Sequence, residues 1–191
     1  MDGQKQKEKP HRAKISASRE IAHLALMVAL IAVCTYISIP FGQVPFTLQT
    51  FAVCLAGGLL GAKRGAAAVL VYLLAGLCGV PVFAGFQAGA AALAGPTGGY
   101  LWGFLGTALL SGAFAALPAK GRGYAALLGI GMALGVCACY ACGTLWFCLI
   151  YRCSVWYALG VCVLPYLLAD AAKVSLAAAV CLRLRRLPRG G

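Results

Sequence analysis

Charged side chains are almost absent from the long middle of this chain. Of twenty charged residues among 191, only seven lie between Ile21 and Leu182. A soluble domain carries about a quarter charged residues, which cover its surface. Here 62% of the residues are hydrophobic instead. The pattern excludes a secreted or cytosolic enzyme and predicts an all-α, multi-pass protein of the cell membrane, almost all of it inside the bilayer.

Apolar runs give the candidate membrane spans. Six can be drawn, over residues 20–39, 49–61, 66–79, 98–117, 124–149 and 155–182. A helix needs about 20 residues to cross a bilayer, so the second and third are too short unless adjoining loops contribute. Such interrupted segments are typical of transporters, where irregular backbone lines a cavity. We therefore expect a basic tail (1–19), a six-helix membrane domain (20–182) and a second basic tail (183–191).

The basic residues predict the orientation. With six spans and the N-terminus inside, fourteen Lys and Arg fall on the inner side and Arg152 alone on the outer side. Positive charge marks cytoplasmic segments, so both termini are expected in the cytoplasm. The net charge of +12 then reflects topology and affinity for anionic lipid. A nucleic-acid partner is not expected, because the charges form no folded basic face.

Two outward connections, residues 40–48 and 80–100, carry no charge and are rich in Pro, Gly and aromatic residues. Ordinary exposed loops are polar. Apolar connections are expected to fold back over an apolar surface, and we predict that these two cap a pocket between the helices. Re-entrant packing without a function is the alternative.

The last apolar segment contains an acid–base pair. Asp170 is the only acidic residue after Glu20, and Lys173 follows three positions later, on the same helix face. Each charge costs roughly 2.5–3.5 kcal/mol in mid-bilayer, so a pair there predicts a function. We interpret it as the polar floor of a ligand pocket. An ion pair that only ties helices together is the alternative.

Other chemistry is sparse. Most of the ten cysteines lie singly in apolar runs, and the C-x-x-C at Cys139–Cys142 has no His, Asp or Glu near it in sequence. We expect them to pack as small apolar residues, without a metal site or redox role. The chain has no G-x-x-x-x-G-K-[ST], H-E-x-x-H or G-x-S-x-G motif, so neither ATP hydrolysis by a P-loop nor other catalysis is expected.

The first segment carries a stripe of small residues. Ser18, Ala22, Ala25, Ala29 and Ala32 recur along one helix face. Small residues let another helix approach closely, so the stripe predicts a partner helix, inside or outside the chain. Similar pairs elsewhere are Gly57-x-x-x-Gly61, Gly99-x-x-x-Gly103 and Gly131-x-x-x-Gly135.

Four motifs carry a resemblance to a known family. They are VPFTLQT at 44–50, GVPVFAG at 79–85, GPTGGY at 95–100, and Leu164-Pro165-Tyr166-x-x-x-Asp170-x-x-Lys173. Their order and spacing resemble the BioY family over about residues 20–182, although Phe usually follows the Pro in the fourth motif. Members of that family are biotin-capturing S-components of energy-coupling-factor (ECF) transporters.

The resemblance implies a six-helix protein that binds biotin from outside. It also implies assembly with a transmembrane coupling protein and two cytosolic ATPases, followed by toppling of the whole S-component to release the substrate. ATP would be bound by those partners alone. The coupling protein would contact Ala22, Ala25 and Ala29. A stand-alone transporter or channel for a small solute, without dedicated ATPases, is the alternative, and a tetraspan-like scaffold or an intramembrane enzyme explains less of the pattern.

The chemistry of biotin gives each expected site residue a role. Asp170 can accept from a ureido N–H and Lys173 can donate to the ureido carbonyl. Aromatic side chains, Phe86 among them, suit the thioether ring and the valeryl chain. The expected substrate-binding residues are Asp170, Lys173, Gln49, Thr47, Phe46, Phe83, Gly85, Gln87, Tyr100 and Tyr166.

Overall fold

Helices make up most of the structure, a computed structural model that describes residues 8–40 and 44–186. Residues 1–7 and 187–191 of the two expected tails, and 41–43 of the first outward connection, lie outside the described residues. The elements in chain order are α1 (Glu8–Tyr36), β1 (Ser38–Ile39), β2 (Phe46–Thr47), α2 (Gln49–Leu60), α3 (Ala62–Leu77), η1 (Ala84–Phe86), α4 (Ala90–Ala94), α5 (Gly98–Ala115), α6 (Gly121–Tyr151), α7 (Val155–Cys162), η2 (Leu164–Tyr166) and α8 (Leu167–Arg186).

The predicted segments correspond to helices, with one correction. The sequence analysis treats residues 155–182 as a single helix, but α7 ends at Cys162 and α8 begins at Leu167, with the short 3-10 turn η2 between them. Pro165 lies in that turn. Its ring and its missing N–H prevent the helix of α7 from continuing. The break separates Tyr166 from the helix that carries Asp170.

The surface suits a membrane. Among the described residues, three stretches are long and apolar enough to cross one: Ser18–Tyr36, Gly121–Tyr151 and Val155–Arg185. Large apolar side chains point outward from them, since Leu149, Trp156 and Leu168 are 76%, 84% and 88% exposed. Such a surface fits lipid contact. The number of spans stays a prediction, because α2 has 12 residues and α3 has 16.

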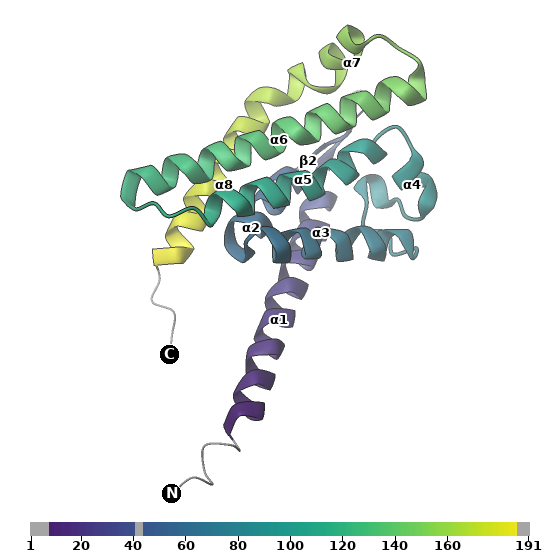
Figure 1. Cartoon of the computed structure of the whole chain (residues 1–191). Helices are drawn as coiled ribbons and strands as arrows, with labels where there is room; N and C mark the ends of the chain where they lie inside the picture. The colour runs from purple at the N-terminus through teal and green to yellow at the C-terminus, as the bar shows by residue number, and fades with distance from the viewer. Residues whose placement is uncertain (1–7, 41–43, 187–191) are drawn as a thin grey trace, which may run out of the picture.

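Close backbone contact joins α5 and α6, which run side by side in Figure 1. A Cβ added at Gly103 would lie 2.8 Å from Cys139 Cα, and one at Gly135 would lie 2.9 Å from Thr107 Cα. The Thr107 hydroxyl donates to Gly135 O at 2.9 Å across this interface. Two of the small-residue pairs seen in the sequence therefore pack these two helices together.

The N-terminal half of α1 extends away from the other helices (Figure 1). The buried face of α1 includes Met27 and Ile31. Ala22, Ala25 and Ala29 of the small-residue stripe are all exposed. Within the described part of the chain, no helix covers these three alanines, whereas Ala32 of the same stripe packs against the core.

Candidate ligand-binding site

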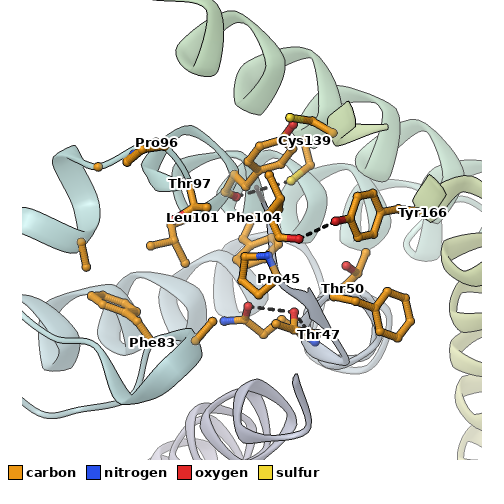
Figure 2. A pocket seen from close by; sticks show the side chains of 18 of the residues that line it. Pro45, Thr47, Thr50, Phe83, Pro96, Thr97, Leu101, Phe104, Cys139 and Tyr166 are labelled. Carbon is orange, nitrogen blue, oxygen red and sulfur yellow. Dashed lines mark hydrogen bonds between the residues drawn. The ribbon is translucent and has the colours of Figure 1, made fainter. Parts of the chain in front are cut away.

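A cavity of about 630 Å³ lies where both outward connections meet the helices. Its lining comes from residues within 44–50, 83–92 and 95–104, and from α6, α7, η2 and α8. Figure 2 shows Phe83 and Tyr166 on opposite sides of it, with Pro45 and Thr47 between them. Small-molecule sites usually have volumes of about 300–1,000 Å³. The cavity therefore has the size of a site for a small organic ligand.

An ion pair lies in the cavity wall. The Lys173 ammonium is 2.7 Å from Asp170 Oδ1, and both side chains are buried, with exposures of 7% for Lys173 and 9% for Asp170. The three-residue spacing on α8 places them on one face, as the sequence predicts. Because each charge neutralises the other, the site has no net charge from this pair. Both residues line the cavity, so the pair is not enclosed by helix packing.

Lys173 makes three contacts through its ammonium group. Besides Asp170, Lys173 Nζ donates to the backbone carbonyl of Thr47 at 2.6 Å, and it lies 3.8 Å from the centroid of the Phe46 ring. Of the three N–H bonds of an ammonium, two therefore donate to oxygens, and the cation lies over an aromatic ring. Lys173 thus ties α8 to the short strand β2, which pairs with β1 in the register Ser38↔Thr47.

Asp170 keeps capacity for a ligand. Its second oxygen, Oδ2, accepts a short hydrogen bond from the Tyr140 hydroxyl on α6. A carboxylate can accept about four hydrogen bonds. Among the described residues, Lys173 and Tyr140 use two of these positions, which leaves two for N–H donors of a molecule in the cavity.

Gln49 and Thr47 form a neutral polar part of the wall. The Thr47 hydroxyl donates to Gln49 Oε1 at 3.0 Å and accepts from the Gln49 backbone N–H at 3.4 Å. Gln49 is the first residue of α2 and is 4% exposed. The Thr47 side chain thus satisfies a free N–H at the start of α2 and orients the first side chain of that helix.

Aromatic rings supply the apolar walls. Phe46 and Tyr166 stack with their centroids 6.2 Å apart, and the Tyr166 hydroxyl donates to the Val44 carbonyl. Phe83 is held from behind by the ring of Tyr72, at 5.6 Å in an edge-on geometry. The ring of Tyr100 packs over Gly143 of α6, where a Cβ would lie 2.3 Å from it.

Nearly all the expected site residues meet at this cavity. Two of the expected positions lie elsewhere: Gly85 is absent from the lining, and Phe86 is 69% exposed and stacks on Tyr36, with centroids 4.7 Å apart. Gly85 has φ +70 and forms the turn η1, which directs Phe86 outward. The expected residues that line the cavity are Phe46, Thr47, Gln49, Phe83, Gln87, Tyr100, Tyr166, Asp170 and Lys173.

The sequence analysis missed Tyr140, which both lines the cavity and bonds to Asp170. A signal for it exists, because a tyrosine inside an apolar helix needs a partner for its hydroxyl when it is buried. Thr50 and Thr97 also line the cavity and were not expected.

Comparison with known proteins finds similarity to one family. A model of the BioY family matches residues 5–189. The chain is 42% identical over 170 residues to the biotin transporter BioY of Thermotoga maritima, covering 88% of this chain and 97% of that protein. It is 37% identical over 168 residues to the probable biotin transporter BioY of Pyrococcus horikoshii, with the same coverage of 88% and 97%.

The fold also has a counterpart among solved structures. The crystal structure of the S-component for biotin from an ECF-type ABC transporter matches with a TM-score of 0.79. The sequence identity in that comparison is 29%, and the match covers 92% of this chain and 94% of the solved one.

Proposed function

Since the chain belongs to the BioY family, we propose that it captures biotin and takes part in its uptake as the S-component of an ECF-type ABC transporter. The resemblance seen in the four sequence motifs is thereby confirmed. A biotin transporter with several apolar helices is a multi-pass protein of the plasma membrane. Its relatives are named as transporters, and a non-catalytic role is part of the proposal.

The observation that carries the proposal is a buried acid–base pair that lines a cavity of ligand size. A pair that served only to join helices would be sealed between them. The ureido group of biotin has two N–H donors, and Asp170 has two acceptor positions left beside its bonds to Lys173 and Tyr140. A ligand without these N–H donors would leave the buried carboxylate unpaired, so charge-assisted hydrogen bonds of this kind discriminate strongly against it.

We propose for Lys173 a role other than that of a direct donor. Two of its N–H bonds already donate to Asp170 and Thr47 O, and the ammonium lies over the Phe46 ring. We assign it to holding the carboxylate and the β2 segment in place. The ureido carbonyl then needs a neutral donor, and the Gln49 amide, which lines the cavity, is the candidate.

The remaining parts of the site follow from their positions. Phe46, Phe83, Tyr100 and Tyr166 would pack against the ring and chain of biotin, while Thr47 and Gln87 would reach its polar groups. Gly85 would act indirectly, through the turn that places Phe83 and Gln87 on either side of it; these two residues pair through Phe83 N and Gln87 O at 3.0 Å.

The proposed partners are a transmembrane coupling protein and two cytosolic ATPases, which alone would bind ATP. Ala22, Ala25 and Ala29 are the proposed docking face for the coupling protein, and their exposure supports this. The start of α1 and the end of α8 lie toward the same side in Figure 1. That placement supports six spans with both termini in the cytoplasm and the two outward connections over the pocket.

Uptake of labelled biotin by a biotin-requiring host tests the proposal. The chain would be expressed alone and together with a coupling protein and ATPases of an ECF module. Uptake that requires the module supports the S-component role. Uptake at the same rate without any module favours the stand-alone transporter, which the comparisons do not favour.

A further inference from the structure

The hydroxyl of Tyr72 connects three helices and an outward connection behind the cavity. Tyr72 is on α3, has no exposed surface and is not among the lining residues. Gln49 Nε2 donates to its hydroxyl oxygen at 2.6 Å, and the hydroxyl donates to the carbonyl of Val82 at 2.9 Å. Thr35 Oγ1 of α1 lies 3.2 Å away. One atom therefore joins α1, α2, α3 and the residues that precede Phe83.

The protons in this network fix the direction of the Gln49 amide. A tyrosine hydroxyl has one proton, and a carbonyl oxygen only accepts. The proton of Tyr72 therefore goes to Val82 O, and Tyr72 is left as an acceptor. Gln49 must turn its NH₂ group toward Tyr72, so its Oε1 faces the Thr47 hydroxyl, which donates to it. The reverse orientation of the amide would draw the Tyr72 proton to Gln49 Oε1 and leave the Val82 carbonyl without its donor.

This orientation decides what the cavity offers a ligand. An amide has two N–H bonds and two lone pairs. Tyr72 takes one N–H and Thr47 takes one lone pair. Among the contacts of the described residues, one N–H and one lone pair of Gln49 are left over, and Gln49 lines the cavity. The wall thus presents a donor beside an acceptor, with fixed polarity.

We propose that Tyr72 is a positioning residue for ligand binding. By accepting from Gln49 and donating to Val82 O, it sets the polarity of the Gln49 amide toward a ligand that carries a donor next to an acceptor, such as a cyclic urea. This proposal rests on the proposed function, because the ureido ring of biotin is the ligand group that it concerns.

The chain offers a matched control. Tyr36 donates its hydroxyl to the carbonyl of Pro81 at 2.8 Å. Tyr36→Phe therefore removes a hydrogen bond to the residue before Val82 and leaves the hydrogen bonds of Gln49 unchanged. Tyr72→Phe keeps the ring that packs on Phe83 and removes only the hydroxyl. The comparison separates orientation of the amide from simple anchoring of the connection.

The test is a double-mutant cycle of biotin affinity in detergent-purified protein, with Tyr72→Phe, Gln49→Met and the double variant. We expect Tyr72→Phe to weaken binding about tenfold, Tyr36→Phe to change it by about twofold or less, and Tyr72→Phe to have no further effect in the Gln49→Met background. Equal losses in the two phenylalanine variants, or a full additional loss in the double variant, would overturn the proposal.

A Tyr72→Phe variant that does not fold, and a wild type that does not bind biotin, lead to further conclusions. If Tyr72→Phe alone does not fold, Gln49→Met is compared with the double variant, in which the unpaired amide is gone. Equal affinities then support the proposal and a lower affinity of the double variant overturns it. Absence of biotin binding by the wild type overturns the proposed function together with this inference, whereas normal binding with an additive cycle overturns the positioning role alone.

Discussion

Tyr140 on α6 donates its hydroxyl to Asp170 on α8, thirty residues further along the chain. The bond holds Oδ2 of the carboxylate while Lys173 holds Oδ1. Asp170 is therefore fixed at both oxygens from two different helices, and it lines the cavity in that fixed position. Preorganised acceptors of this kind bind a matching donor without a cost for reorientation.

Loss of this bond is expected to weaken ligand binding. Hydrogen bonds to charged groups contribute about 1.5–3 kcal/mol, so Tyr140→Phe should raise the dissociation constant of biotin roughly tenfold to a hundredfold. Isothermal titration of purified protein measures this. Tyr157→Phe is the control, because Tyr157 is exposed on α7 and is not among the residues that line the cavity. An unchanged affinity in Tyr140→Phe would show that the carboxylate needs no support from α6.

Variants of the ion pair should distinguish its effect on stability from its effect on biotin binding. Lys173→Met leaves the buried Asp170 carboxylate without its counter-charge, and breaking such a pair costs about 3–5 kcal/mol. The double variant Asp170→Asn/Lys173→Met removes both charges and should regain most of the thermal stability, because a neutral pair has no comparable desolvation penalty. Biotin binding should stay lost in both.

Thermal unfolding in detergent, run beside a binding assay, distinguishes these results. Ser175→Ala serves as the control, since Ser175 is exposed on the same helix. Recovery of binding in the double variant would mean that the pair serves only to hold the helices together.

The exposed alanines of α1 should be required for assembly but not for capture. Ala25→Trp/Ala29→Trp prevents a helix from approaching closely, because such contacts depend on small side chains. We expect co-purification of the coupling protein to fall about tenfold, equivalent to about 1.4 kcal/mol, with unchanged biotin affinity. His23→Trp is the control, because His23 is exposed but is neither three nor four positions from Ala22, Ala25 or Ala29. Normal assembly of the double variant would place the docking face elsewhere.

The connection between α3 and α5 should become more protected when biotin binds. It lies over the cavity and is tied down by a few hydrogen bonds, such as Gly89 N to Gly76 O at 2.7 Å and Trp146 Nε1 to Gly95 O at 3.0 Å. Few anchors allow local opening. Hydrogen exchange should slow within residues 83–92 on addition of biotin, while the middle of α5 serves as an unchanged reference. Identical exchange in both states would show that the connection does not act as a lid.

The ion pair of the site could be predicted because charged residues are rare in the apolar segments. Asp170 and Lys173 stand out because charges inside apolar helices are expensive, and their spacing alone places them on one face. The starts of α2 at Gln49 and of α5 at Gly98 also follow from the apolar pattern. The break after Cys162 was readable in principle from Pro165, yet the apolar run on both sides of it suggested one helix.

Contacts between distant residues were not predictable. The bond from Lys173 to Thr47 O joins residues 126 positions apart, and it gives one N–H bond of the ammonium a partner within the protein. The stacking of Phe86 on Tyr36 likewise removes an aromatic ring from the expected pocket wall. Composition identifies which side chains are unusual, but their partners depend on how the helices pack.

Binding of labelled biotin to the detergent-purified chain, without any partner, tests the central claim most directly. The account predicts saturable binding with one biotin per chain. It also predicts an affinity loss of about tenfold or more in Asp170→Asn, because the amide has no charge and an NH₂ donor in place of one acceptor oxygen, and none in the exposed control Ser175→Ala. A wild-type chain that binds no biotin, or an Asp170→Asn variant that binds it as tightly as the wild type, would contradict the account.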